Sequence, residues 1–224
     1  VYKKDHYFAN ILSFTDQTGV VSDSLLRAEA ARQDRLIDSA GPRPEYLFRR
    51  AVTNYLLRNY EPALKDLDAT LAADSGFITA WFCRANVRYE LIQVISAREE
   101  YQPVTIALST QKPQVPVATS ASTLEHTYEA VIRDLNRALA LDPGFAFAWY
   151  NKGFVNSRMG NYREAVEDLT KAINIRPGFA EAWFNRGLIN ILLDDNRAGC
   201  NDLSRAGELG IADAYRVMKR YCYK

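Results

Sequence analysis

The stretch FAFAWYNKGFVNSRMGNYREAVEDLTKAINIRPGFAEA, residues 145–182, decides the fold of this chain. Its small and large apolar residues are spaced as in two helices that pack against each other. Two helices approach closely only where small residues meet, so Gly153 of the first helix is expected to face Ala165 of the second. Pro177 would end the second helix and set the turn that follows. The space around the contact would be filled by large side chains, namely Trp149, Tyr162 and Leu169.

The same pattern returns 34 residues later, where Trp183 and Gly187 repeat Trp149 and Gly153. The turns between the copies agree: they read DSGF at 74–77, DPGF at 142–145 and RPGF at 176–179. The first helices also agree: they read YLFRRAV at 46–52, AWFCRAN at 80–86, AWYNKGF at 148–154 and AWFNRGL at 182–188. Four copies of one helical pattern predict an almost entirely α-helical protein.

With this spacing the chain resembles the tetratricopeptide-repeat family over roughly residues 44–213. The resemblance implies an all-α fold, a right-handed α-solenoid of helix hairpins (an α-α superhelix) with a capping helix at each end. Departures from the pattern are Gly199 and Val131 in the slot of Ala165, and Leu47 in the slot of the tryptophan. The ending GCNDLSRAGELGIADAYRVMKRYC also resembles the C-terminal repeat region of exported Bacteroidetes-type proteins of this family.

The predicted organisation has a tail of an upstream segment at 1–21 and an array at 22–224. The second copy is interrupted, because Trp81 and Val131 are 50 residues apart where Trp149 and Ala165 are 16 apart. Its first helix should continue to about Ala97, and the Pro-rich and Ser/Thr-rich stretch 101–123 favours an extended loop. The array is divided into an N-terminal capping helix (22–43), repeat 1 (44–77), repeat 2 (78–145, insertion at about 99–123), repeat 3 (146–179), repeat 4 (180–210) and a C-terminal capping helix (211–224).

Composition excludes several classes of protein. The 224 residues are 48% hydrophobic and 25% charged, with a net charge of +1, which is typical of a globular chain with no strong pull toward nucleic acid. The sequence contains no stretch of about 18 apolar residues, which is the length that a membrane-spanning helix requires. No GxSxG, HExxH, P-loop or GxGxxG motif occurs, so we expect no enzyme, no catalytic residues and no cofactor.

The three cysteines are far apart, and neither a CxxC pair nor a neighbouring histidine suggests a metal site. The favoured interpretation is three unpaired cysteines. A bridge between Cys200 and Cys222 is the alternative if the compartment is oxidising, because the last helix folds back on its predecessor.

The resemblance implies that the first helices line a concave groove in which partners lie. Phe154 and Leu188 could equally belong to the core, and Tyr150 and Phe184 could pack between repeats. Chaperone-tail recognition is not implied, because the Lys/Asn/Arg set that clamps a C-terminal carboxylate is lacking. Phe48 and Val52 replace its Lys and Asn in the first repeat, and Phe147 takes a later lysine slot. The predicted groove residues are Arg49, Asn86, Tyr150, Asn151, Phe154, Phe184, Asn185 and Leu188.

Asn151 and Asn185 occupy equivalent slots one repeat apart. A side-chain amide can both donate to and accept from a peptide backbone, and a buried amide needs partners. Their replacement by alanine is therefore expected to weaken binding and to leave the melting temperature nearly unchanged.

Two functions stay open at this point. The first is a protein-interaction scaffold that holds a peptide or protein partner in the groove. The second is a structural or self-association module of a larger protein, with no ligand in the groove. The periplasm or cell envelope is the first expectation for its location, from the resemblance of its C-terminal ending, and the cytoplasm is the alternative.

Overall fold

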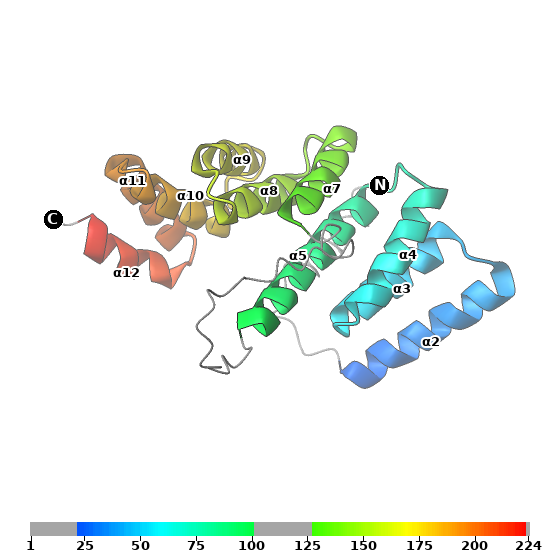
Figure 1. Cartoon of the computed structure of the whole chain (residues 1–224). Coiled ribbons are helices and arrows are strands. Elements are labelled where there is room, and N and C mark those ends of the chain that lie inside the picture. Colours follow the sequence, from blue (N-terminus) through cyan, green and yellow to red (C-terminus); the bar gives the residue numbers. More distant parts are fainter. Residues whose placement is uncertain (1–21, 101–126, 223–224) are drawn as a thin grey trace, which may run out of the picture. The chain divides into compact units, whose positions relative to one another are not determined.

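The structure, a computed structural model, describes residues 22–100 and 127–222 (Figure 1). Within these ranges all regular structure is α-helical, and no strand occurs, which confirms the predicted fold class. The predicted tail at 1–21 and the predicted loop at 101–123 lie outside the described residues. The helices are α2 (Asp23–Ala40), α3 (Pro44–Leu56), α4 (Tyr60–Ala73), α5 (Ile78–Glu100), α7 (Tyr128–Leu141), α8 (Ala146–Arg158), α9 (Tyr162–Ile175), α10 (Ala180–Leu192), α11 (Asn196–Glu208) and α12 (Ala212–Tyr221).

These helices belong to two compact units. The described part of the first unit is 22–100 with 127–131, and that of the second is 132–222. How the helices group into repeats and caps stays a prediction.

In the first unit each helix packs on the next, from α2 through α3 and α4 to α5. Pro44 begins α3 and Pro62 lies in the first turn of α4, where a missing N–H costs no hydrogen bond. The core between the helices is apolar and fully buried, with Ala51, Ala63 and Leu67 at zero exposure. Helix α5 has 23 residues, against 13 in α3. It was expected to extend to about Ala97, and it ends at Glu100.

The second unit contains two helix hairpins, α8 with α9 and α10 with α11, and then α12, which packs on α11. A Cβ atom on Gly153 would lie 2.9 Å from Cγ of Leu169 and 3.1 Å from the carbonyl oxygen of Ala165. The close approach predicted between Gly153 and Ala165 is confirmed. Gly187 repeats it, because its Cβ would lie 3.1 Å from the carbonyl oxygen of Gly199.

The cysteines differ from the favoured prediction of three unpaired thiols. Cys200 of α11 and Cys222, directly after α12, form a disulfide with their Cα atoms 5.8 Å apart. The fold brings them together because α12 runs back along α11. Cys83 is the free cysteine among the described residues, and its complete burial raises the pKa of its thiol to about 12.

Candidate partner-binding site

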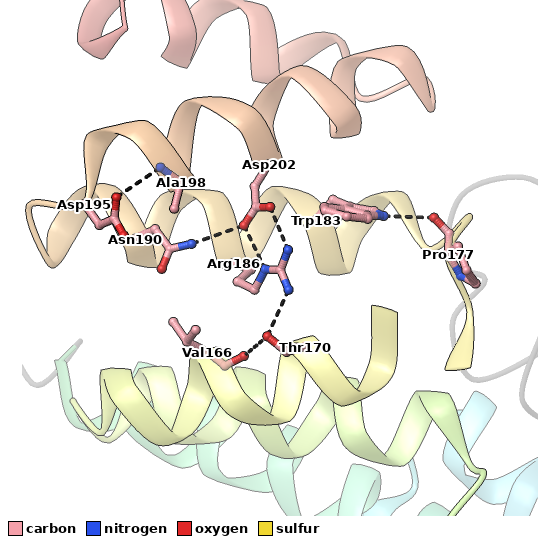
Figure 2. Close-up of polar contacts among 9 residues, drawn as sticks. All are labelled: Val166, Thr170, Pro177, Trp183, Arg186, Asn190, Asp195, Ala198 and Asp202. Carbon is pink, nitrogen blue, oxygen red and sulfur yellow. Dashed lines mark hydrogen bonds and ion pairs between the residues drawn. The ribbon is translucent and has the colours of Figure 1, made fainter. Parts of the chain in front are cut away.

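A repeated set of ion pairs holds the hairpins in register. In the last hairpin the guanidinium of Arg186 donates from Nε and Nη2 to both carboxylate oxygens of Asp202, at 2.8 and 2.7 Å (Figure 2). A third nitrogen of Arg186, Nη1, donates to the hydroxyl of Thr170 on α9 at 2.9 Å. One side chain of α10 therefore binds both its own hairpin and the preceding one.

The same arrangement recurs in the first unit. Arg50 binds Asp66 in its own hairpin through two hydrogen bonds, at 2.8 and 2.7 Å, and Asp34 of α2 through a third at 2.7 Å. The hydrogen bond to Asp66 is the main reason that the pKa of Arg50 is raised. Arg84 of α5 makes the backward contact to Asp68 of α4, at 2.6 Å.

In the hairpin of α8 and α9, Lys152 occupies the position that Arg50 and Arg186 occupy in the other two hairpins. Nζ of Lys152 lies 3.3 Å from one oxygen of Asp168, and the amide of Asn156 donates to the other oxygen at 2.9 Å. Burial raises the pKa of Asp168, and the nearby charge of Lys152 opposes the shift. Sequence reasoning missed this set, although an Asp-Leu pair at 66–67, 134–135, 168–169 and 202–203 was a visible signal.

The tryptophans anchor the turns in the same repetitive way. The indole nitrogen of Trp183 donates to the carbonyl oxygen of Pro177 at 2.9 Å (Figure 2). Trp149 makes the equivalent bond to Pro143, and Trp81 to Ser75, each at 2.9 Å. Each bond joins a tryptophan to the turn that precedes its own helix.

The predicted binding residues of the second unit lie on α8 and α10, at positions that are half-buried and not closed. The buried positions of α10 include Ala182, Gly187 and Ile189, whereas positions 184, 188 and 192 follow each other at helical spacing and are half-buried or exposed. Leu192 is 66% exposed and was missed by the sequence analysis. We name this surface the α8–α10 face, made up of Tyr150, Asn151 and Phe154 on α8 and Phe184, Asn185, Leu188 and Leu192 on α10.

Some of these side chains also hold the hairpins together. The ring of Tyr150 lies 4.7 Å from that of Phe179, which precedes α10, and 6.5 Å from that of Phe154. Phe184 and Leu188 pack against a cluster formed by Leu203, Ala206, Ala214 and Met218. Part of the surface of these aromatic side chains is therefore buried by packing between helices, as the alternative interpretation expected.

Asn185 also has a partner inside the protein. Its Nδ2 donates to the hydroxyl oxygen of Tyr150 at 3.0 Å. The amide of Asn185 therefore depends less on a ligand than expected, since one of its hydrogen bonds is made between the two hairpins. Asn151, which occupies the equivalent slot one repeat earlier, is half-buried on α8.

The two predicted residues of the first unit lie on different helices. Arg49 is exposed on α3, and Asn86 is half-buried on α5. The apolar slots beside them are closed, because Phe48, Val52 and Phe82 are at most 5% exposed. The ring of Phe48 lies tilted against that of Phe77, with 4.8 Å between the ring centres. In the second unit the corresponding slots keep accessible surface.

The described residues contain no group of three or more His, Cys, Asp or Glu side chains that could hold a metal ion. Among the described helices, none combines the length and the hydrophobicity that a membrane span requires. The accessible chemistry of the α8–α10 face is therefore that of rings, aliphatic side chains and amides.

Comparison with known proteins places these features in context. A profile of the tetratricopeptide repeat matches residues 146–179. Among curated protein sequences no match was found. Solved structures with similar folds include the protein MamA, at 18% identity over 83% of each chain with a TM-score of 0.63.

Two further structures have the same fold. TTC0263, a thermophilic protein with these repeats from Thermus thermophilus, is 15% identical over 88% of this chain and 89% of that one, with a TM-score of 0.58. The first repeat domain of Spaghetti (RPAP3), bound to the HSP90 peptide SRMEEVD, is 15% identical over 68% of this chain and 94% of that one, with a TM-score of 0.51. At such identities the likeness establishes the fold alone.

Proposed function

Because the chain has the tetratricopeptide-repeat fold and carries that repeat at residues 146–179, we propose that it is a non-catalytic scaffold that binds a protein or peptide partner on the α8–α10 face. The observation that carries the proposal is the row of accessible apolar side chains at helical spacing on α10, which ends in Leu192 at 66% exposure. Contiguous accessible apolar surface that includes aromatic residues is typical of interaction sites.

The chemistry of this face favours an uncharged stretch of the partner. Phe154, Leu188 and Leu192 offer apolar contact, and the amides of Asn151 and Asn185 can bond to backbone groups. None of the seven residues that define the face carries a charge. An internal apolar segment of a partner therefore fits better than a terminal carboxylate.

Recognition of an acidic peptide end is not part of the proposal. The Spaghetti domain is bound to the HSP90 peptide SRMEEVD, whose last residue is an aspartate. In this chain two slots of the corresponding basic and amide set hold Phe48 and Val52, which are 3% and 5% exposed. Contributions from Arg49 and Asn86 to a partner site remain proposals for the first unit.

The test begins with a capture of partners from the source organism by the purified array. The captured partner is then titrated calorimetrically into the parent protein and into Leu192→Asp. A charge in the apolar row should weaken binding at least tenfold, because about 1.4 kcal/mol corresponds to a factor of ten and burying an unpaired carboxylate costs more.

Ile175→Asp is the matched control. Ile175 ends α9 and is 42% exposed, so the same charge is introduced at an accessible apolar position outside the α8–α10 face. Unchanged affinity of Ile175→Asp together with weakened binding by Leu192→Asp supports the proposal. Equal affinity of all three proteins places the partner elsewhere.

A further inference from the structure

Glu90 of α5 is a carboxylate that lacks a counter-charge. Its side chain is half-buried, and it makes neither an ion pair nor a hydrogen bond with the described residues. The buried carboxylates of Asp66, Asp168 and Asp202 differ, because each has an arginine or a lysine as its partner. Partial removal of a charge from water costs free energy when no opposite charge compensates it. A cation beside Glu90 would therefore be favoured.

The position of Glu90 on its helix keeps the carboxylate accessible. Glu90 follows Val87, which is fully buried, by three residues, and it follows Asn86 by four. Residues at these spacings are neighbours on a helix surface. Asn86 is half-buried and belongs to the predicted groove residues of the first unit. Glu90 thus lies where the buried side of α5 meets the side on which a partner was expected.

Two tyrosine rings lie beside this carboxylate. Tyr55 is in the last turn of α3 and Tyr60 begins α4, and the centres of their rings are 6.1 Å apart, with the planes tilted by 48°. Burial is the main cause that raises the pKa of both hydroxyls, and the charge of Glu90 raises the pKa of each further. Since the effect of a charge falls with distance, the carboxylate lies near both hydroxyls. Three helices of the first unit, which pack on one another, bring these groups together.

One basic side chain is close to this cluster. Arg58, in the turn between α3 and α4, lowers the pKa of Tyr60 by its charge. Its side chain is exposed, and within the described ranges it forms no ion pair with Glu90. The carboxylate is therefore available to a cation from outside the chain.

We propose that Glu90, Tyr55 and Tyr60 form a binding site for an alkylammonium group, such as the end of a lysine side chain. The carboxylate attracts the positive charge, and the faces of aromatic rings attract cations as well. The aliphatic stem of the ligand packs along the rings. The inference does not depend on the α8–α10 face, which belongs to the second unit.

The experiment titrates the nitrogen-15-labelled full chain with small probes and follows the backbone amide signals by NMR. The first probe is N-acetyl-lysine methylamide. The second is N-acetyl-norleucine methylamide, which keeps the four-carbon side chain and lacks the charge. The third is putrescine, a free amine. Whichever of the two amines binds more tightly tells whether a protein side chain or a free amine is the better ligand, and either order supports the site.

We expect the lysine derivative to shift the signals around residue 90 and to bind about tenfold more tightly than the norleucine derivative. Glu90→Gln should remove most of this difference. Glu45→Gln is the matched control, because Glu45 is exposed in the first turn of α3, and it should bind like the parent. Equal binding of the two derivatives by the parent would overturn the inference, and so would unchanged binding of the lysine derivative by Glu90→Gln.

Two variants of Tyr60 test the part played by the ring. Tyr60→Phe keeps the ring and should keep the affinity for the lysine derivative, whereas Tyr60→Leu should weaken binding several-fold. Circular dichroism at increasing temperature shows that each variant is folded. Equal affinities of Tyr60→Leu and the parent would contradict a role for the ring and overturn the site as proposed.

Discussion

The side-chain amide of Asn185 donates a hydrogen bond to the hydroxyl oxygen of Tyr150, 3.0 Å away, and so joins α10 to α8. Both residues belong to the α8–α10 face. The contact shows that this face is held together by some of the groups that would meet a partner. Substitutions there have to be separated into those that loosen the hairpins and those that remove a binding contact.

Asn185→Ala should lower the free energy of unfolding by about 1 kcal/mol, because it removes a hydrogen bond between two hairpins. From the sequence alone, the joint replacement of Asn151 and Asn185 by alanine was expected to leave stability nearly unchanged. Urea denaturation followed by circular dichroism measures the difference.

Tyr150→Phe provides the matching half of a double-mutant cycle. It removes the hydroxyl acceptor and keeps the ring on Phe179. If the bond is responsible, the double variant should cost less than the two single costs added together. Additive costs would mean that the two side chains do not stabilise each other.

Gly153→Ala should destabilise the fold by roughly 1–3 kcal/mol, because overpacking forces neighbours apart. The new methyl group would lie 2.9 Å from Cγ of Leu169 and 3.2 Å from its backbone nitrogen. Gly178→Ala is the control, since nothing lies within 4 Å of a Cβ there. Thermal unfolding of both variants measures the contrast, and equal melting temperatures would show that Gly153 is not a close contact.

Lys152→Arg should stabilise the chain by about 1 kcal/mol, because an arginine can bind both oxygens of Asp168 as Arg186 binds those of Asp202. Lys152 itself makes one bond of 3.3 Å. Lys171→Arg is the control, as Lys171 is exposed and 3.9 Å from Asp168. Urea unfolding of the variants at neutral pH tests the difference.

The stability gained in Lys152→Arg should also depend on pH. Burial raises the pKa of Asp168 above its ordinary value of 3.8, so the folded chain holds this proton to higher pH than the unfolded chain. The stability that the proton contributes is lost as the pH rises from 3.8 through the folded-state value. Closer pairing in Lys152→Arg lowers that value, so the advantage of the variant over the parent should grow across this window. An advantage that is constant with pH would contradict the assignment.

The fold could be predicted from the sequence because the repeat depends on residues whose size and shape determine how two helices pack. Gly153 permits a close approach and Pro177 ends a helix, whatever surrounds them. The disulfide was only an alternative, because spacing along the chain does not show that α12 returns Cys222 to Cys200.

The candidate site was harder to predict for a physical reason. A residue on one face of a helix can meet a partner, a neighbouring repeat or both, and the spacing is the same in each case. Tyr150 and Asn185 turn out to meet each other. Leu192 was overlooked since it lies at the end of its helix, where the repeat pattern carries little constraint.

Site-specific crosslinking in cells of the source organism tests the central claim most directly. A photoreactive benzoylphenylalanine is placed singly at Leu188 or Leu192 on the α8–α10 face, and at Glu167 or Arg205, which are exposed on α9 and α11. If the chain is a scaffold that binds its partner on this face, irradiation should give the same covalent adduct at positions 188 and 192 and none at 167 and 205. Adducts at 167 or 205 with none at 188 and 192 would contradict it.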